Sequence, residues 1–273
     1  MKKNLLSIWA LLAGLCLLTA CSDDDDEKDL PQAPLKLQKI SGQCIAGAGL
    51  GTASASFTAT YDKQGRLQTL LAQRGGGENV NVLNNLIDVQ RGVMTDVATG
   101  EETGTISFDA QGRIECIKVW IEEGTDRRLC TARSFKYNAD GYLASNTLYN
   151  TDTETPFYIV SYEYQNGTMS QITYATANSK GQWDETKEPV EYTQIPNRNN
   201  LFLLATTEIC FYMNAGLMGK FSLPYLPVVE SDEANPYQLD KQGNVMRRTV
   251  TFGTPDDSYY LRSEENFEYV GLN

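Results

Sequence analysis

Apolar and polar residues alternate along most of the chain, and this alternation predicts half-buried β-strands. Phe57, Ala59 and Tyr61 share one side of a strand, and the segments 117–121 and 160–164 repeat the pattern. We expect an all-β fold, an antiparallel meander of about a dozen strands between residues 37 and 269. A sheet of that many strands usually curls or closes, so we expect it to be strongly curved or barrel-like.

A turn motif recurs between the predicted strands. It has an aromatic residue or leucine, then Asp or Asn, then Gly, and an apolar residue two positions after the Gly. Its copies are Tyr61–Leu67, Phe108–Ile114, Tyr137–Leu143 and Leu239–Val245, and Tyr164–Met169 is one residue shorter. The Asp or Asn side chain accepts hydrogen bonds from backbone amides, and the Gly supplies the positive φ that closes the turn. The expected turn-forming residues are therefore Asp62, Gly65, Asp109, Gly112, Asn138, Gly141, Asn166, Gly167, Asp240 and Gly243.

One segment interrupts the alternation. Residues 197–219 carry apolar side chains on nearly every side of a helical projection, which predicts one internal buried helix. Asn197 or Asn200 can cap its start, and Gly216 and Gly219 can end it. A transmembrane span is the alternative, but the polar residues within the segment would be costly in lipid. We expect the helix to plug or cap the β structure.

The first twenty residues have the pattern of a lipoprotein signal peptide. Lys2 and Lys3 are positive, and Leu5–Leu18 is an apolar core that is short for a membrane span. The next residues complete Leu-Thr-Ala-Cys, which resembles a bacterial lipobox. This resemblance implies cleavage before Cys21 and lipidation of Cys21, so that acyl chains would hold the protein to a membrane. An ordinary secretory signal with an incidental cysteine is the alternative.

An acidic run follows Cys21. Residues 23–29 hold six acidic side chains and one lysine, and Pro31 and Pro34 come next. Such a run stays solvated, so residues 22–36 are expected to form a flexible tether. Acidic residues after the lipidated cysteine also resemble the export signal of Bacteroidota-type lipoproteins on the outer face of the outer membrane. We therefore expect a lipid-anchored protein exposed on the cell surface, with the periplasmic face as the alternative. The domains are then 1–20 (signal peptide), 21–36 (lipidated Cys and tether) and 37–273 (a single β domain).

The charge and amino-acid composition exclude several kinds of binding and catalytic site. The chain has 273 residues, a formal net charge of −12 and no histidine. The acidic balance argues against nucleic-acid binding through phosphates. Without histidine there is no Ser–His–Asp triad, no Cys–His dyad and no imidazole metal ligand, and we expect no metal site and no cofactor.

The expected β domain contains four cysteines, in an export compartment where disulfides persist. They are Cys44, Cys116, Cys130 and Cys210. Cys116 and Cys130 flank Glu123-Gly124, where a hairpin could pair them in a disulfide. Two buried free thiols are the alternative.

The turn motifs, the lipobox and the predicted helix together resemble a family of Bacteroidota-type lipoproteins of unknown function, with a porin-like fold and YD-type hairpin repeats. In that family, YD-type turns such as Tyr61–Gly65 precede an internal helix. Gly219–Pro224 is similar to the segment after the helix, and Leu239–Val245 to the closing hairpin. The resemblance covers roughly residues 40–270. It implies a curved or barrel-like antiparallel sheet and assigns no catalytic residues.

Three functions fit these features. A binding or scaffolding module for a glycan or protein ligand is favoured by the anchor, the tether and 15 tyrosines, which can serve as recognition surfaces. A carboxylate-based glycosidase needs two facing acids, for which Glu163, Glu191 and Glu208 are candidates. A carrier would hold an apolar ligand inside the β structure, with residues 201–213 as its lid. We favour the non-enzymatic binding module, whose ligand-binding residues the sequence does not identify.

Overall fold

A computed structural model describes residues 35–46, 51–75, 83–123, 126–178, 180–204, 207–254 and 261–271. The chain divides into two units, Met1–Gln32 and Ala33–Asn273. The expected signal peptide, Cys21 and nearly all of the tether lie outside the described residues. The fold below is therefore that of the second unit.

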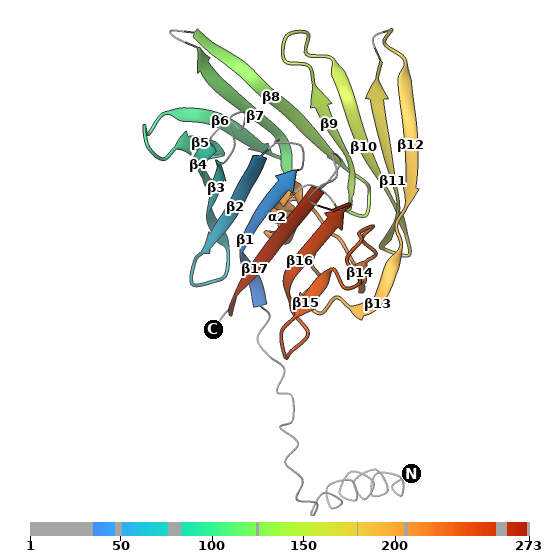
Figure 1. Cartoon of the computed structure of the whole chain (residues 1–273). Coiled ribbons are helices and arrows are strands. Elements are labelled where there is room, and N and C mark those ends of the chain that lie inside the picture. Colours follow the sequence, from blue (N-terminus) through green and yellow to red (C-terminus); the bar gives the residue numbers. More distant parts are fainter. Residues whose placement is uncertain are drawn as a thin grey trace, which may run out of the picture. The chain divides into compact units, whose positions relative to one another are not determined.

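The described residues form antiparallel hairpins around one short helix (Figure 1). The strands are β1 (Leu35–Ala46), β2 (Gly51–Tyr61), β3 (Leu67–Gly75), β4 (Leu83–Asp88), β5 (Val93–Asp96), β6 (Glu102–Phe108), β7 (Ile114–Glu123), β8 (Asp126–Tyr137), β9 (Leu143–Tyr149), β10 (Pro156–Gln165), β11 (Thr168–Ala177), β12 (Trp183–Pro189), β13 (Tyr192–Pro196), β14 (Tyr225–Pro227), β15 (Tyr237–Leu239), β16 (Val245–Phe252) and β17 (Leu261–Gly271). The prediction of an all-β antiparallel fold is confirmed. The predicted number of about a dozen strands is too low, because strands as short as β5 leave no readable alternation.

Fifteen strands form one sheet, in the order β12-β11-β10-β9-β8-β7-β6-β5-β4-β3-β2-β1-β17-β16-β15. Strands β1 to β12 each pair with their neighbours in the chain, and β17 pairs antiparallel with β1. The first and last strands therefore meet inside the sheet, away from its edges. In the described part of the chain, β13 and β14 form a separate two-stranded sheet.

The expectation of a strongly curved or barrel-like sheet is wrong, because the sheet is neither closed nor strongly curled. Its edges are β12 and β15, which are not neighbours within the described residues. Strand β12 is exposed and rich in charge along its whole length, and β15 has only three residues. Charged and short edge strands are features that oppose further strand pairing. Closure is therefore not needed to protect these edges.

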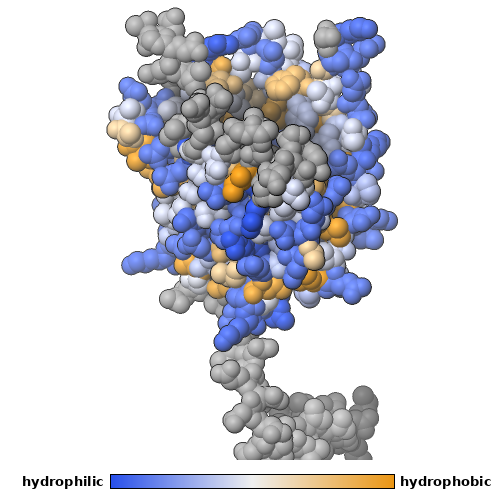
Figure 2. All heavy atoms as spheres, viewed as in Figure 1, coloured by the Kyte–Doolittle hydropathy of each residue, from blue (hydrophilic) through white to orange (hydrophobic). Residues whose placement is uncertain are grey.

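The described residues of the segment 197–223, which we call the plug segment, pack on one face of the sheet, the inner face. The helix α2 (Thr207–Asn214) lies in this segment, and Phe211 of α2 stacks on Phe57 of β2 with ring centroids 5.4 Å apart. Buried residues of the helix and of the sheet belong to one hydrophobic core. The prediction of one internal buried helix is confirmed. The outer face seen in Figure 2 is mostly polar, with scattered apolar side chains.

The helix is shorter than the predicted 197–219, because asparagine side chains hold the preceding residues in another conformation. Asn197 Oδ1 accepts a hydrogen bond from the amide of Leu201 (2.9 Å), and its Nδ2 donates to the carbonyl of Leu201 (2.8 Å). Asn214 bonds in the same two-way manner to the backbone of Phe202. Asparagine side chains that bond to nearby backbone compete with helical hydrogen bonds.

The five sequence-predicted turns all lie at one end of the sheet, which we call the turn end. Successive antiparallel strands reverse direction, so the connections after β2, β6, β8, β10 and β15 fall together. In the first, Asp62 Oδ1 accepts from the amides of Gln64 and Arg66, and Gly65 has φ 72°. The same arrangement recurs at Asp109 and Gly112, at Asn138 and Gly141, and at Asp240 and Gly243. Asn166 and Gly167 form the two-residue turn, with φ 52° and 81°.

Tyrosines also lie at the turn end, and they link one hairpin to the next. The hydroxyl of Tyr137 on β8 donates to the carbonyl of Ile114 at the start of β7 (2.6 Å). The equivalent bonds join Tyr61 to Leu37, Tyr164 to Leu143, Tyr192 to Met169 and Tyr269 to Val245, over 2.6–3.0 Å. We call these five tyrosines the tyrosine belt. Each one satisfies a backbone carbonyl 21 to 24 residues earlier in the chain.

Candidate functional site

A pocket of about 240 Å³ lies on the outer face of β7, β8 and β9. Its position follows from the alternation of the strands, because Ile117 and Phe135 are buried on the inner face. Their chain neighbours Lys118 and Ser134 therefore point outward, and both line the pocket. This volume lies below the range of roughly 300–1,000 Å³ that drug-sized ligands occupy. The pocket suits a small molecule or one end of a larger one.

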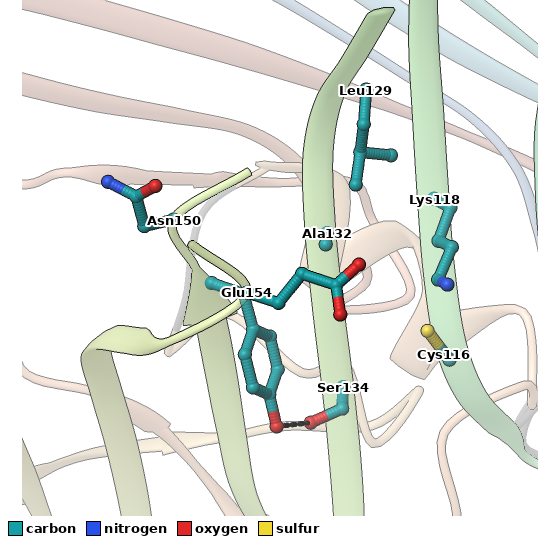
Figure 3. A pocket seen from close by; sticks show the side chains of 8 residues that line it. Cys116, Lys118, Leu129, Ala132, Ser134, Asn150 and Glu154 are labelled. Atoms are coloured by element: carbon teal, nitrogen blue, oxygen red, sulfur yellow. Dashed lines mark hydrogen bonds between the residues drawn. The ribbon is translucent and has the colours of Figure 1, made fainter. Parts of the chain in front are cut away.

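Two side chains of opposite charge reach into the pocket from different elements. Lys118 extends from β7, and Glu154 extends from the loop between β9 and β10 (Figure 3). The ammonium and the carboxylate point into the same space, over Ala132 of β8. In the described part of the chain, neither group takes part in an ion pair. Both charges are therefore available to a ligand.

The remaining walls combine apolar and hydroxyl groups. Leu129 and Ala132 of β8 supply apolar surface, and Tyr149 and Asn150 line the side toward the loop. Ser134 Oγ and the Tyr149 hydroxyl lie 3.0 Å apart and share a hydrogen bond (Figure 3). One of the two hydroxyls donates its hydrogen in this bond. The other hydroxyl can still donate a hydrogen bond to a polar ligand, and both oxygens keep lone pairs that can accept one.

Cys116 of β7 also lines the pocket. Burial raises the pKa of its thiol, while the Lys118 ammonium lowers it and the Glu115 carboxylate raises it further. The thiol is thus protonated at neutral pH, and the thiolate is the nucleophilic form of cysteine. Cys116 is therefore a weak nucleophile at neutral pH.

The loop that carries Glu154 is built around an asparagine. Asn150 Oδ1 accepts hydrogen bonds from the amides of Asp152 and Thr153 (2.9 and 3.0 Å). The Glu154 amide donates to the Asn150 carbonyl (2.8 Å), which closes the loop. Glu154 itself has φ 53°, in the left-handed region. No sequence motif indicates this pocket, because its residues come from three strands and a loop.

The four cysteines Cys44, Cys116, Cys130 and Cys210 have free thiols in this structure. The β7–β8 register places Cys116 opposite Ser134, and Cys130 falls at a bulge opposite Val119 and Trp120. The hairpin therefore does not bring Cys116 and Cys130 face to face. Its centre lies between Glu123 and Asp126, beyond the midpoint of the two cysteines.

The carboxylates considered for a glycosidase do not gather in the pocket. Glu163 is exposed on β10 and accepts a hydrogen bond from Gln171 Nε2 (3.0 Å). Glu191 is exposed between β12 and β13, and the side chain of Glu208 lies outside the described residues. Within the described ranges, no three Cys, Asp or Glu side chains come together as a possible metal site.

The apolar side chains of the plug segment, which suggested a lid over an apolar ligand, pack against the sheet. Phe202, Phe211 and Met213 are at most 1% exposed. The helix α2 has eight residues, and the part of the chain that the structure describes holds no helix long and apolar enough to cross a membrane.

No family model matches this chain, and no curated protein matches it. Among solved structures, it is similar to a porin-like protein from Bacteroides uniformis. The two are 18% identical over 88% of this chain and 99% of the other, with a TM-score of 0.47. A second similarity is to the TcdB2-TccC3-TEV structure, at 13% identity over 80% of this chain and 11% of that chain, with a TM-score of 0.27. The resemblance to a lipoprotein family with YD-type repeats stays a prediction.

Proposed function

We propose that this protein is a lipid-anchored, cell-surface binding module without catalytic activity, and that the β7–β9 pocket is its ligand site. The observation that carries the proposal is the pair of charges in that pocket. Lys118 and Glu154 face one space on the outer side of the sheet, and no ion pair with another described residue occupies either. A few convergent polar groups in a concave site are typical of ligand pockets.

The course of the chain agrees with an anchored module. Leu35, where β1 begins, pairs with Gly271 at the turn end of the sheet, so the tether would join the domain there. The loop that carries Glu154 follows β9 and lies at the opposite end. From Cys21 to Leu35 there are 14 chain steps (35 − 21), which span at most about 50 Å when extended. The start of the domain and the pocket loop therefore lie at opposite ends of the sheet.

A pocket-filling variant tests the proposal. Ala132→Phe places a large side chain on the pocket floor, at an outward position of a strand, where aromatic residues are well tolerated. The full-length lipoprotein in detergent is applied to glycan and peptide arrays. We expect a ligand that the unaltered protein binds and the variant does not.

The matched control is Thr173→Phe, on the outer face of β11 beside the buried Ile172. We expect this control to keep ligand binding. If Ala132→Phe binds as well as the unaltered protein, or if neither the arrays nor a titration with small molecules yields a ligand, the pocket is not the ligand site.

A further inference from the structure

We infer that the β7–β9 pocket takes a small zwitterion, a free amino acid, with its acid group on Lys118 and its amino group on Glu154. This inference rests on the proposed function and adds the ligand's chemistry. A molecule with both charges would engage both pocket charges at once. The wall formed by Leu129 and Ala132 would receive the ligand's side chain.

The backbone of Glu154 points to a role for its side chain. Three loops of the sheet share one hydrogen-bonding plan: Asp88–Gly92, Asp96–Gly100 and Asn150–Glu154. In each, the first side chain accepts hydrogen bonds from the amides two and three residues later. In each, the fifth residue's amide donates to the first residue's carbonyl (2.8–2.9 Å).

The fifth residue is left-handed in all three loops, with φ 65° at Gly92, 76° at Gly100 and 53° at Glu154. Glycine adopts this conformation without steric cost, whereas a residue with a Cβ atom does not. Two of the loops use glycine, and the third places a glutamate there. Unfavourable backbone conformations that persist tend to mark functional positions. The carboxylate of Glu154 lies in the pocket (Figure 3). A role in binding a ligand there would explain why this loop has a glutamate in place of glycine.

Lys118 supplies the complementary charge. It sits on a strand whose position is fixed by pairing with β6 and β8, so its ammonium approaches the pocket from a rigid element. Charged hydrogen bonds are about twice as strong as neutral ones. The Ser134–Tyr149 hydroxyl pair can bond to either end group of an amino acid.

Isothermal titration calorimetry with the full-length lipoprotein in detergent tests the inference. The probes are the free protein amino acids, the N-acetyl and carboxamide forms of the tightest binder, and glucose as an uncharged comparison. We expect an amino acid to bind, and the loss of either ligand charge to weaken binding about tenfold or more.

Variants assign each charge to its partner. In Lys118→Gln the carboxamide should bind as well as the free acid, and in Glu154→Gln the acetylated form should bind as well as the free amine. Glu185→Gln and Lys187→Gln, on the exposed edge strand β12, should change neither comparison. Glu154→Gly should lose binding without a lower Tm, because glycine suits the left-handed position.

The outcomes separate the inference from the proposed function. Equal affinity for the amino acid and its singly charged forms, or full affinity in Glu154→Gly, overturns the inference. If an array ligand is lost in Ala132→Phe while no amino acid binds, the zwitterion assignment fails and the binding function stands. If no probe from either screen binds, both fail.

Discussion

At the scale of single residues, the tyrosine belt couples side-chain chemistry to stability. Burial raises the pKa of Tyr61 and Tyr192 to about 12, and that of Tyr137 and Tyr164 also lies above its ordinary value. A buried hydroxyl that donates to a backbone carbonyl must stay protonated to do so. The hydrogen bonds of the belt are therefore sensitive to alkali.

The sign of this effect follows from linkage. An unfolded tyrosine ionises near pH 10, and the folded belt resists ionisation, so the stabilisation is complete below about pH 10. It is lost as pH rises through about 12, the raised pKa of Tyr61 and Tyr192. We expect the free energy of unfolding in urea to fall steeply between these values. A profile that stays flat there contradicts the belt's role.

Tyr137→Phe isolates one bond of the belt. The change removes the donor to the Ile114 carbonyl, and we expect a loss of about 1–2 kcal/mol at neutral pH with a shallower alkaline decline. Tyr225→Phe is the control, because Tyr225 is 46% exposed and should leave stability unchanged.

At the scale of elements, a buried ion pair fastens the plug segment to the sheet. Arg248 of β16 and Glu265 of β17 are opposite each other in the register, and Arg248 Nε donates to Glu265 Oε2 (2.6 Å). Arg248 Nη1 also donates to the carbonyl of Leu203 in the plug segment (2.7 Å). The two side chains are 12% and 7% exposed, so removing either one takes the ion-pair partner from a buried charge.

Arg248→Met should therefore destabilise the protein by about 3–5 kcal/mol in urea unfolding, because the buried Glu265 carboxylate loses its ion pair with Arg248. The double variant Arg248→Met/Glu265→Leu should lose less, because no charge is left behind. Arg247→Met is the control. Arg247 pairs with Glu264 at a more exposed position, and its loss should cost about 1 kcal/mol or less. Equal losses in the two single variants would show that the Arg248 pair does not fasten the plug segment.

Elements held by hydrogen bonds between neighbouring residues could be predicted from the sequence, whereas elements held by contacts between distant residues could not. The turns were readable because Asp62 and Gly65, or Asn138 and Gly141, close each loop with atoms from a few adjacent residues. The length of the helix could not be predicted from the sequence, because the side chain of Asn214 bonds to the backbone of Phe202, 12 residues earlier. Such a contact exists only once the plug segment is folded.

The pocket was beyond prediction for the same reason. Lys118, Ser134 and Glu154 are separated in the chain, and only the register of three strands brings them together. One local signal was present. The loops that end in Gly92 and Gly100 have the pattern of the loop that ends in Glu154, so the missing glycine marked that position.

At the scale of the whole molecule, the pairing of β1 with β17 places the start of the domain, where the proposed tether would join, at the opposite end of the sheet from the proposed ligand loop. It holds both Leu35 and Gly271 at the turn end, while the pocket depends on strands β7 to β9. We therefore expect anchoring and ligand binding to be independent. Cys21→Ala should remove the acylation site, release the protein from the membrane fraction and change its electrophoretic mobility, while ligand affinity stays as in the unaltered protein.

Fractionation and calorimetry on the same preparations measure both halves of this prediction. Ser22→Ala is the control, because it alters the adjacent residue and leaves the cysteine in place. Unchanged fractionation and mobility in Cys21→Ala would remove the lipid anchor from the proposal. Protease treatment of intact cells addresses the location separately, and a protein that survives it would lie on the periplasmic face. A released Cys21→Ala protein that no longer binds ligand would instead show that the pocket needs the membrane, against the separation that the β1–β17 pairing predicts.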